Sequence, residues 1–544
     1  MSKPQHRKLL FFLGGILLCL GLLACRETAP EIISIEPRIG SMGDIVTIYG
    51  TGFGDERYES YITIAGTPPT TSSYISWNDM EISFRVPEFG DAGLVYVHRG
   101  RRRSNPALLA NQTTMPVLVR TEAGNGPLIT SIEPASGPIG SLITIQGNNF
   151  GSSRNTSGVF FSWNAEASAG TAAGTEAPDF IETSEEEFGY ELWGEREIRV
   201  RVPDGAVSGN LEVRTHVGNS RPVYFEITGS PGTKAYRDKR TYTLSYLADI
   251  QIAEAHTPNS LYVWMPRPAM LASQRNVALL SRNIEPFIEN YRGTSLYHFI
   301  DILPGNRWEI ALSYVVEVYA IETSIRNQAP VRLNRPSPVR AANVLPSPLI
   351  PSNEPAIRTQ AATIIGREAQ PLARASMIYQ WLISSLEIQN FPGLGGAMEA
   401  LSERTADSYR AALLFCALAR AVDIPAIPVA GVLVNRQRNA TKHYWAEFWL
   451  DGFGWVPLDP TLGAGAAPQD FNLREDFARY YFGNMDNQRI TFSRGERFLY
   501  QMTPRGRTVQ RSRAFSLQNL WEEAIGGLES YSSLWSDVTI TGVY

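Results

Sequence analysis

The stretch SERTADSYRAALLFCALARAVDIP, residues 402–425, carries the clearest structural signal in this 544-residue chain. Its apolar residues recur at helical spacing, and the continuation AIPVAGVLV predicts a buried strand directly after the helix. Any of Thr405, Ala406 and Asp407 could cap the start of this helix. Ser408 therefore lies in the first turn, where unpaired N–H groups and the helix dipole stabilise a developing negative charge.

A second stretch, KHYWAEFWLDGFGWVPLDPT at residues 442–461, predicts a β-hairpin. His443 opens an alternating strand, an Asp-Gly pair marks the turn, and the sequence WVPLDP returns. Folding this hairpin brings Asp459 to within about two residues of the position opposite His443, where a carboxylate can orient an imidazole. With Ser408 these two residues make a complete set for acyl transfer, namely a nucleophile, a base and an orienting carboxylate.

The helix and the hairpin together resemble the transglutaminase-like superfamily, whose papain-like core carries cysteine, histidine and aspartate in this order. The motifs H-x-W-x-E and G-W-x-x-x-D-P-T fit the family pattern, and the resemblance covers residues 355–465. It implies an α+β papain-like core with a catalytic triad at Ser408, His443 and Asp459. The resemblance also implies three candidates to line a cleft: Trp445, Glu447 and Trp455.

The chain departs from the family pattern at the nucleophile. Aligning SYRAALLF with the family's C-x-x-x-A-x-L-F helix puts Ser408 on the catalytic cysteine, and Asp423 takes the place of a glycine before the I-P-A exit. Cys416 cannot replace the missing thiol, because eight residues further along a helix it lies about 12 Å away. A cysteine at this position can rest as a thiolate, whereas a serine hydroxyl needs the histidine to remove its proton.

This substitution leaves two hypotheses about function. The first is a pseudoenzyme, a transglutaminase-like domain that is weakly active or non-catalytic and binds a peptide or glycan. The second is an active Ser-His-Asp enzyme of acyl transfer, which could be a peptidase, an amidase or a protein cross-linking enzyme. Retention of both His443 and Asp459 favours activity, whereas a serine in a site shaped around sulfur favours a weak or silent site.

The amino terminus predicts export and lipid anchoring. A basic start is followed by an apolar run too short for a typical membrane span, and LLAC at residues 22–25 resembles a bacterial lipobox. That resemblance implies a signal peptide of residues 1–25 and a lipid on the Cys25 thiol. The predicted location is the cell envelope, with the membrane as one partner and an envelope protein, peptide or glycan as another. Arg26 after the cysteine favours the outer membrane over the inner one.

An internal repeat follows. PEIISIEPRIGSMGDIVTIYGTGFG at residues 30–54 aligns without a gap over PLITSIEPASGPIGSLITIQGNNFG at residues 127–151. Alternating strands between Gly and Pro turns describe small β-sandwiches, and both copies resemble the immunoglobulin-like IPT/TIG family. We predict these sandwiches at residues 26–112 and 126–229, with an acidic insertion at residues 164–195 in the second.

The fold class predicted for the whole chain is therefore multidomain. Residues 234–330 alternate with period two and predict a third β-sandwich before the core. A proline-rich linker at residues 331–354 separates it from the transglutaminase-like core at residues 355–465. Residues 466–544 are aromatic and strand-like, and we expect this extension to complete the core.

Composition narrows the range of partners. A formal net charge of -5 gives no reason to expect nucleic acid as a partner. We predict no metal and no cofactor, because the remaining histidines of the mature chain have no metal-ligand spacing. These histidines are His98, His216, His256 and His298. Once Cys19 leaves with the signal and Cys25 carries lipid, only Cys416 remains, so no intramolecular disulfide can form.

Overall fold

The structure, a computed structural model, describes residues 29–40, 43–87, 92–100, 102–111, 126–165, 179–327, 331–390 and 392–544. The predicted signal peptide and Cys25 lie outside the described residues. The chain divides into two compact units, of which the first holds the first repeat and the second holds the remaining domains. None of the helices in the described ranges is both long and apolar enough to cross a membrane.

Each repeat forms a sandwich of two antiparallel-rich sheets with the same strand order. In the first repeat, one sheet contains β1 (Glu31–Glu36), β3 (Ile45–Thr51), β6 (Glu81–Arg85) and β5 (Tyr74–Trp77). Its second sheet contains β2 (Ile39–Gly40), β9 (Ala107–Asn111), β7 (Ala92–Arg99) and β4 (Tyr61–Ile64), with β8 (Arg102–Arg103) beside β7. The first pair of strands in both repeats carries the same register shift, which confirms the two predicted immunoglobulin-like sandwiches.

The second repeat differs from the first by one added strand. Its first sheet contains β10 (Leu128–Glu133), β12 (Leu142–Asn148), β16 (Glu197–Arg201) and β15 (Tyr190–Trp193). Its second sheet contains β11 (Ser136–Gly137), β19 (Val223–Ile227), β17 (Gly209–Thr215), β13 (Gly158–Trp163) and β14 (Asp179–Glu182), with β18 (Gly218–Asn219) beside β17. We call residues 126–229 the second sandwich.

The predicted acidic insertion at residues 164–195 is too long. Strand β15 pairs with β16 as β5 pairs with β6 in the first repeat, so it belongs to the shared fold. Strand β14 pairs with β13 and extends the second sheet. The error arose because charged residues disguise the alternation of these short strands; residues 166–178 lie outside the described part of the chain.

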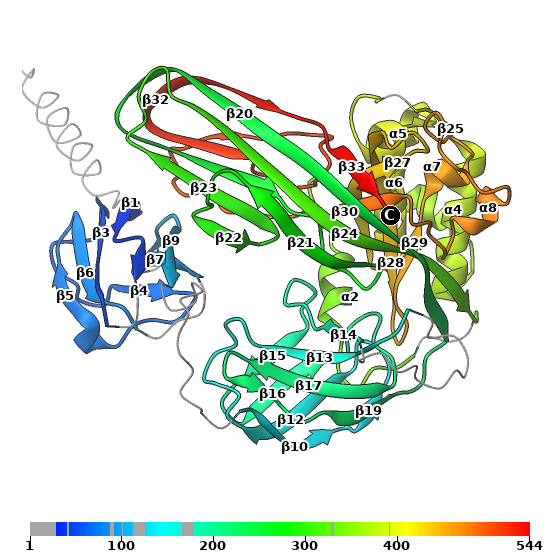
Figure 1. The fold of residues 1–544 in the computed structure, drawn as a ribbon, viewed down its shortest axis with the longest axis horizontal. Coiled ribbons are helices and arrows are strands. Elements are labelled where there is room, and N and C mark those ends of the chain that lie inside the picture. Colours follow the sequence, from blue (N-terminus) through cyan, green and yellow to red (C-terminus); the bar gives the residue numbers. More distant parts are fainter. Residues whose placement is uncertain are drawn as a thin grey trace, which may run out of the picture. The chain divides into compact units, whose positions relative to one another are not determined.

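Long strands build the third sandwich (Figure 1). In spatial order they are β21 (Gln274–Arg282), β24 (Arg307–Ile325), β20 (Gly232–Pro266), β23 (Thr294–Ile300) and β22 (Ile288–Tyr291). Strand β20 pairs with β24 over its first half and with β23 over its second half. The two halves enclose one apolar core, across which the Tyr246 hydroxyl donates a hydrogen bond to the Pro266 carbonyl.

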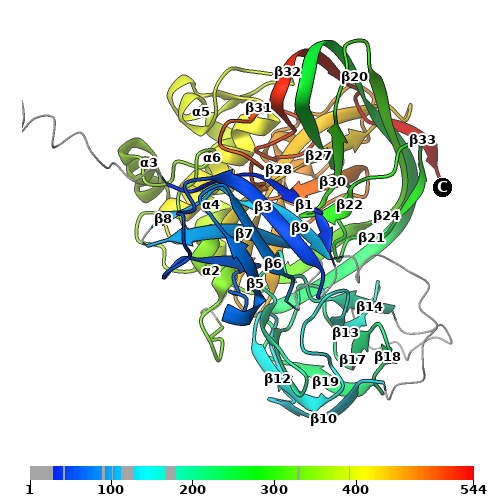
Figure 2. The same cartoon turned by 90° about the vertical axis from the view of Figure 1, so that its left-hand side faces the viewer.

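The carboxyl-terminal residues divide between two sheets. Strands β31 (Arg507–Val509), β32 (Glu522–Trp535) and β33 (Thr539–Val543) join the third sandwich, where β32 and β33 pair with β20 (Figure 2). Only β30 (Arg489–Arg494) joins the core sheet, by pairing with β27 (Ala426–Val434). The extension therefore completes the core only in part, because the long edge of β20 offers unpaired backbone groups that β32 satisfies.

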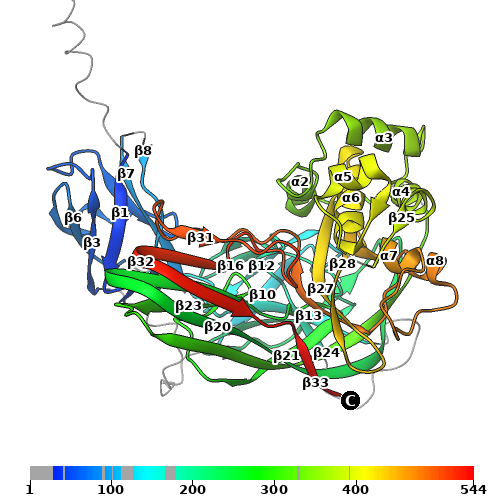
Figure 3. The same cartoon turned by 90° about the horizontal axis from the view of Figure 1, so that it is seen from above.

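The core consists of an antiparallel sheet with helices gathered on one side of it (Figure 3). Its strand order is β29 (Gly454–Leu458), β28 (Ala440–Leu450), β27 and β30. The helices are α3 (Pro355–Ile365), α4 (Pro371–Ser385), α5 (Ala397–Glu403), α6 (Ser408–Ala421), α7 (Pro460–Gly463) and α8 (Phe477–Tyr480). A two-stranded parallel sheet of β25 (Glu387–Ile388) and β26 (Thr405–Ala406) precedes α6.

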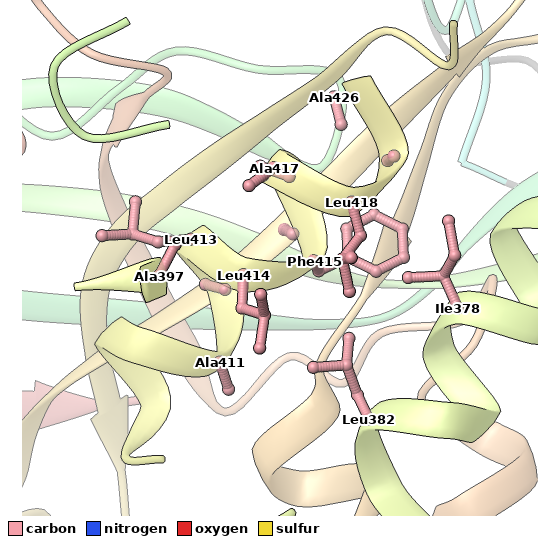
Figure 4. Packing of buried hydrophobic residues seen from close by; sticks show 14 of the residues in the cluster. Ile378, Leu382, Ala397, Ala411, Leu413, Leu414, Phe415, Ala417, Leu418 and Ala426 are labelled. Atoms are coloured by element: carbon pink, nitrogen blue, oxygen red, sulfur yellow. The ribbon is translucent and has the colours of Figure 1, made fainter. Parts of the chain in front are cut away.

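Helix α6 is the centre of the hydrophobic core. Every residue from Tyr409 to Arg420 is buried, and Figure 4 shows Phe415 and Leu418 packed near Ile378 and Leu382 of α4. A large apolar side chain such as Phe415 or Leu418 stabilises the fold by roughly 1.5–3 kcal/mol when it is fully buried. This packing holds the amino terminus of α6 in a defined place.

The predicted linker at residues 331–354 is more ordered than its prolines suggest. It contains helix α2 (Pro338–Asn343), which starts with Pro at its first position and is capped by Ser337. Arg340 of α2 donates to the carboxylate of Asp423 just beyond α6. Asp423 has φ +65°, a left-handed conformation that suits the family glycine and that aspartate also tolerates.

Candidate acyl-transfer site

The amino terminus of α6 is capped by Asp407. Its Oδ1 accepts a hydrogen bond from the Arg410 backbone N–H at 2.9 Å, and its Oδ2 accepts one from the Gly393 N–H at 2.8 Å. The guanidinium of Arg513, from the carboxyl-terminal extension, also binds Asp407. The predicted cap is thus Asp407, and Ser408 is the first residue of the helix, as the alignment with the family cysteine requires.

Ser408 is half-buried, and within the described residues its hydroxyl makes no hydrogen bond to any side chain or backbone group. The adjacent Tyr409 ring meets the edge of the Tyr444 ring with centroids 5.0 Å apart. The amino terminus of α6 therefore lies beside the part of β28 that carries His443. Among the described residues no hydrogen bond joins Ser408 to His443. We expect the two side chains to face each other at hydrogen-bonding distance or a little more, and this stays a prediction.

Alternation along β28 explains part of this arrangement. Side chains of consecutive strand residues point to opposite faces, and Tyr444 points toward α6. His443 therefore leaves the strand on the other face, where its ring stacks on that of Trp445 with centroids 6.4 Å apart. The position of His443 relative to Ser408 therefore depends on how α6 packs against β28.

The structure brings His443 and Asp459 into direct contact. Leu458 pairs with Ala446, so Asp459 falls opposite Trp445, two residues from His443, as the hairpin predicts. The imidazole Nε2 and the carboxylate Oδ2 lie 2.8 Å apart, and the two residues are only 3% and 0% exposed. The other ring nitrogen, Nδ1, makes no hydrogen bond with the described residues.

Asp459 has four hydrogen-bond donors. Besides His443, it accepts from the backbone N–H groups of Thr461 at 3.1 Å and Leu462 at 3.0 Å, which makes it the cap of α7. Its Oδ2 also accepts from Nη1 of Arg489 at 3.1 Å. Burial alone would raise the pKa of Asp459, but His443, Arg489 and the Leu462 N–H together lower that pKa below its usual value.

Arg489 and Asp486 are the site residues that the sequence did not reveal. Arg489 donates to Asp486 through Nη2 at 2.7 Å and through Nε at 3.4 Å. The sequence DNQRITFSR at residues 486–494 is typical of a strand with two charged residues, Asp486 and Arg489, at its start. Nothing local in it points to Asp459, which precedes Arg489 by 30 residues.

The three predicted cleft residues lie on the face of the sheet opposite Tyr444. Trp445 is buried, with the Arg489 guanidinium 4.9 Å above its ring. Glu447 accepts hydrogen bonds from Arg494, and Trp455 is buried in the hydrophobic cluster of the second sandwich. Glu447 and Trp455 line a small polar cavity whose other charged walls are Asp204, Lys234 and Arg494.

Two further expectations concern cysteine and metal. Cys416 is free and buried, and burial raises the pKa of its thiol to about 12, so it is inert at neutral pH. In the described ranges, no group of three or more His, Cys, Asp or Glu side chains could hold a metal ion.

Known proteins match this chain in separate parts. Residues 358–460 match the family model of the transglutaminase-like superfamily, and residues 30–109 and 127–168 match that of the IPT/TIG domain. The chain therefore contains a transglutaminase-like domain preceded by IPT/TIG domains.

Individual relatives overlap this chain over shorter or more divergent stretches. An uncharacterized protein of Haemophilus influenzae is 28% identical over 166 residues, which is 25% of this chain and 45% of that protein, so less than half of that relative is covered. A candidate cysteine protease of Cytophaga hutchinsonii is 14% identical, with a TM-score of 0.38 over 57% of this chain and 92% of that one. The periplasmic domain of TgpA from Pseudomonas aeruginosa is 17% identical, with a TM-score of 0.26 over 44% and 91%.

Proposed function

We propose that the transglutaminase-like domain of this chain is a weakly catalytic or non-catalytic module that binds a peptide or glycan of the cell envelope. The state of Ser408 carries this proposal. In the alignment of the sequence, Ser408 stands at the position of the family's cysteine. Among the described residues its hydroxyl has no hydrogen bond to His443 that would let the imidazole take its proton. A hydroxyl without such a base remains un-ionised at neutral pH and attacks amides poorly.

One observation favours the alternative, an active serine enzyme of acyl transfer. The His443–Asp459 pair is intact and buried, at 2.8 Å, and it supplies the base and the orienting carboxylate that a serine nucleophile needs. Catalytic hydrogen bonds to the nucleophile are often long before substrate binds. Activity would then require substrate to draw Ser408 and His443 together.

Ser408→Cys in a Cys416→Ala background should gain a reactive thiol. The helix amino terminus and His443 should lower its pKa about two units below the free value of about 8.5. The rate of iodoacetamide alkylation against pH, read by mass spectrometry on the tryptic peptide ending at Arg410, measures this shift. Adding His443→Ala should move the inflection back toward the free value.

The control is Ser384→Cys, an exposed position near the end of α4, where an ordinary thiol profile is expected. A Ser408→Cys profile that matches this control and ignores His443→Ala would show that the site is not assembled. The natural chain should bind a peptide or glycan and should release no cleaved or cross-linked product. Robust turnover that Ser408→Ala abolishes would establish the serine enzyme instead.

The envelope location rests on the LLAC sequence at residues 22–25. We expect the mature chain to enter the detergent phase in Triton X-114 partitioning, because acyl chains on Cys25 add apolar surface. Cys25→Ala should move it to the aqueous phase. Cys416→Ala serves as the matched control and should leave partitioning unchanged; cleavage at a site other than Cys25 would contradict the anchor.

A further inference from the structure

Four charged or ionisable side chains form a row through the interior of the core. His443, Asp459, Arg489 and Asp486 are 3%, 0%, 3% and 6% exposed. The successive N···O distances along the row are 2.8, 3.1 and 2.7 Å. Because water is nearly excluded, each charge strongly affects its neighbours.

Arg489 is held at the centre of this row. Its guanidinium binds Asp459 through one nitrogen and Asp486 through two, and it lies 4.9 Å from the centroid of the Trp445 ring. Burial would lower the pKa of Arg489, but the two carboxylates raise it above its usual value, so the group stays charged. The positive charge on Asp459's second partner is therefore permanent.

We infer that Arg489 and Asp486 are positioning residues that set how much negative charge Asp459 presents to His443, and thereby how readily the imidazole takes up a proton. This inference rests on the alternative function given above, in which His443 is the proton acceptor for Ser408. Arg489 donates a hydrogen bond to the same Oδ2 atom of Asp459 that His443 contacts. Its positive charge therefore weakens the attraction between the Asp459 carboxylate and an imidazolium at His443. Asp486 accepts hydrogen bonds from the other side of the Arg489 guanidinium. Its negative charge partly offsets the positive charge of Arg489, so it partly restores the attraction between Asp459 and an imidazolium.

The signs of these two effects are opposite. Two carboxylates and one guanidinium leave the row with one net negative charge when the imidazole is neutral, and with none when it is protonated. Loss of the Arg489 charge favours the imidazolium, whereas loss of the Asp486 charge disfavours it. Looser packing alone would not produce shifts in opposite directions.

The phenols of Tyr379 and Tyr481 also feel Asp459. Burial raises the pKa of both, so neither carries a charge in the range where imidazole titrates. In the described ranges the ion pairs of His443 and Asp459 are with each other and with Arg489, which in turn pairs with Asp486.

The test is the NMR titration of His443 in the full chain labelled with ¹³C at histidine Cε1, with its signal assigned by comparison with His443→Ala. This readout does not require Ser408 to act as a nucleophile. Asp486→Asn should lower the titration midpoint by about one pH unit, and Arg489→Gln should raise it by a similar amount. Asp486→Asn is the gentler change, because asparagine keeps the acceptor for the Gln488 N–H at 2.8 Å.

Two controls make the result specific. Arg489→Lys keeps the charge, so its midpoint should stay near the natural one even though the guanidinium geometry is lost. Asp476→Asn removes an exposed carboxylate whose partner, Arg474, lies 3.8 Å away, and it should shift nothing. No shift in either Asp486→Asn or Arg489→Gln, or shifts in the same direction, would overturn the inference. Opposite shifts together with an ordinary Ser408→Cys thiol profile would support the inference while showing that Ser408 is not assembled with His443. Robust turnover that Ser408→Ala abolishes would instead refute the proposed function and leave the inference standing.

Discussion

Replacing Asp459 by alanine should destabilise the transglutaminase-like domain by about 3–5 kcal/mol, the range seen when one partner of a buried ion pair is removed. The change leaves the His443 N–H and one side of the Arg489 guanidinium without an acceptor in the interior. It also removes the cap of α7, which by itself is worth about 1 kcal/mol. Native-state hydrogen exchange of the β28 and β29 amides measures this free energy without requiring two-state unfolding of the whole chain.

Two variants separate the causes. Asp459→Asn keeps the shape and an oxygen for the α7 backbone, so we expect an intermediate loss. Asp537→Ala removes the exposed partner of Lys442, which neighbours His443 on β28, and it should cost less than about 1 kcal/mol. If Asp459→Ala costs no more than Asp537→Ala, the buried contacts of Asp459 contribute nothing measurable.

The pH dependence follows from the direction of the pKa shift. The folded protein lowers the pKa of Asp459, so the unfolded chain binds the proton more readily. The stabilisation is therefore fully present above the unfolded value of about 3.9 and is lost as pH falls through the lower folded value. The stability advantage of the natural chain over Asp459→Asn should shrink as pH falls below about pH 4, where Asp459 takes up its proton.

The parts of the site that could be predicted from sequence are those fixed by local geometry. His443 and Asp459 are 16 residues apart and joined by a tight turn, so the hairpin register alone places them together. The Asp407 cap lies one residue before the helix it serves. The relation of Ser408 to His443 is different, because it depends on how α6 packs against β28.

Long-range pairing accounts for the rest. Strand β30 returns to the core sheet after α8, and only this return brings Arg489 to Asp459. Residues near the carboxyl terminus pair with β20 across almost 290 positions, as the 2.9 Å hydrogen bond from the Leu247 N–H to Ser536 Oγ shows; its partners are 289 residues apart. Alternation identifies such strands but carries no information on which neighbour each one chooses.

The second sandwich also buries Trp455, which the family resemblance predicts to line a cleft. Trp455 packs in its hydrophobic cluster, and Lys234 of β20 donates both to the Asp204 carboxylate at 2.6 Å and to the Trp455 carbonyl at 2.7 Å. A family pattern defines the core alone. Which face of the core another domain covers depends on residues outside it, such as Asp204 of the second sandwich.

Arg494 joins the core to the second sandwich, and Arg494→Met should loosen both. Its Nε and Nη2 donate to Glu447 at 2.8 and 2.6 Å, while Nη1 binds Glu187 of the second sandwich. Methionine fills much of the volume but leaves Glu447, with a side chain only 9% exposed, as an unpaired carboxylate. We expect a loss of about 3–5 kcal/mol, read as faster hydrogen exchange in β28 and β30 and, together with them, in β15.

A charge-removing second mutation tests whether this loss is electrostatic. Adding Glu447→Gln to Arg494→Met takes away the unpaired carboxylate, so it should recover part of the lost free energy although no ion pair is rebuilt. Arg307→Met is the matched control, because Arg307 pairs with Asp249 at 2.8 Å but is 59% exposed, and its loss should stay within about 1 kcal/mol. Faster exchange in β28 without any change in β15 would show that Glu187 does not couple the two domains. If Glu447→Gln instead slows hydrogen exchange again in both β28 and β15, the cost of burying an unpaired charge loosens the two domains. Loss of packing around Arg494 would then not be the cause.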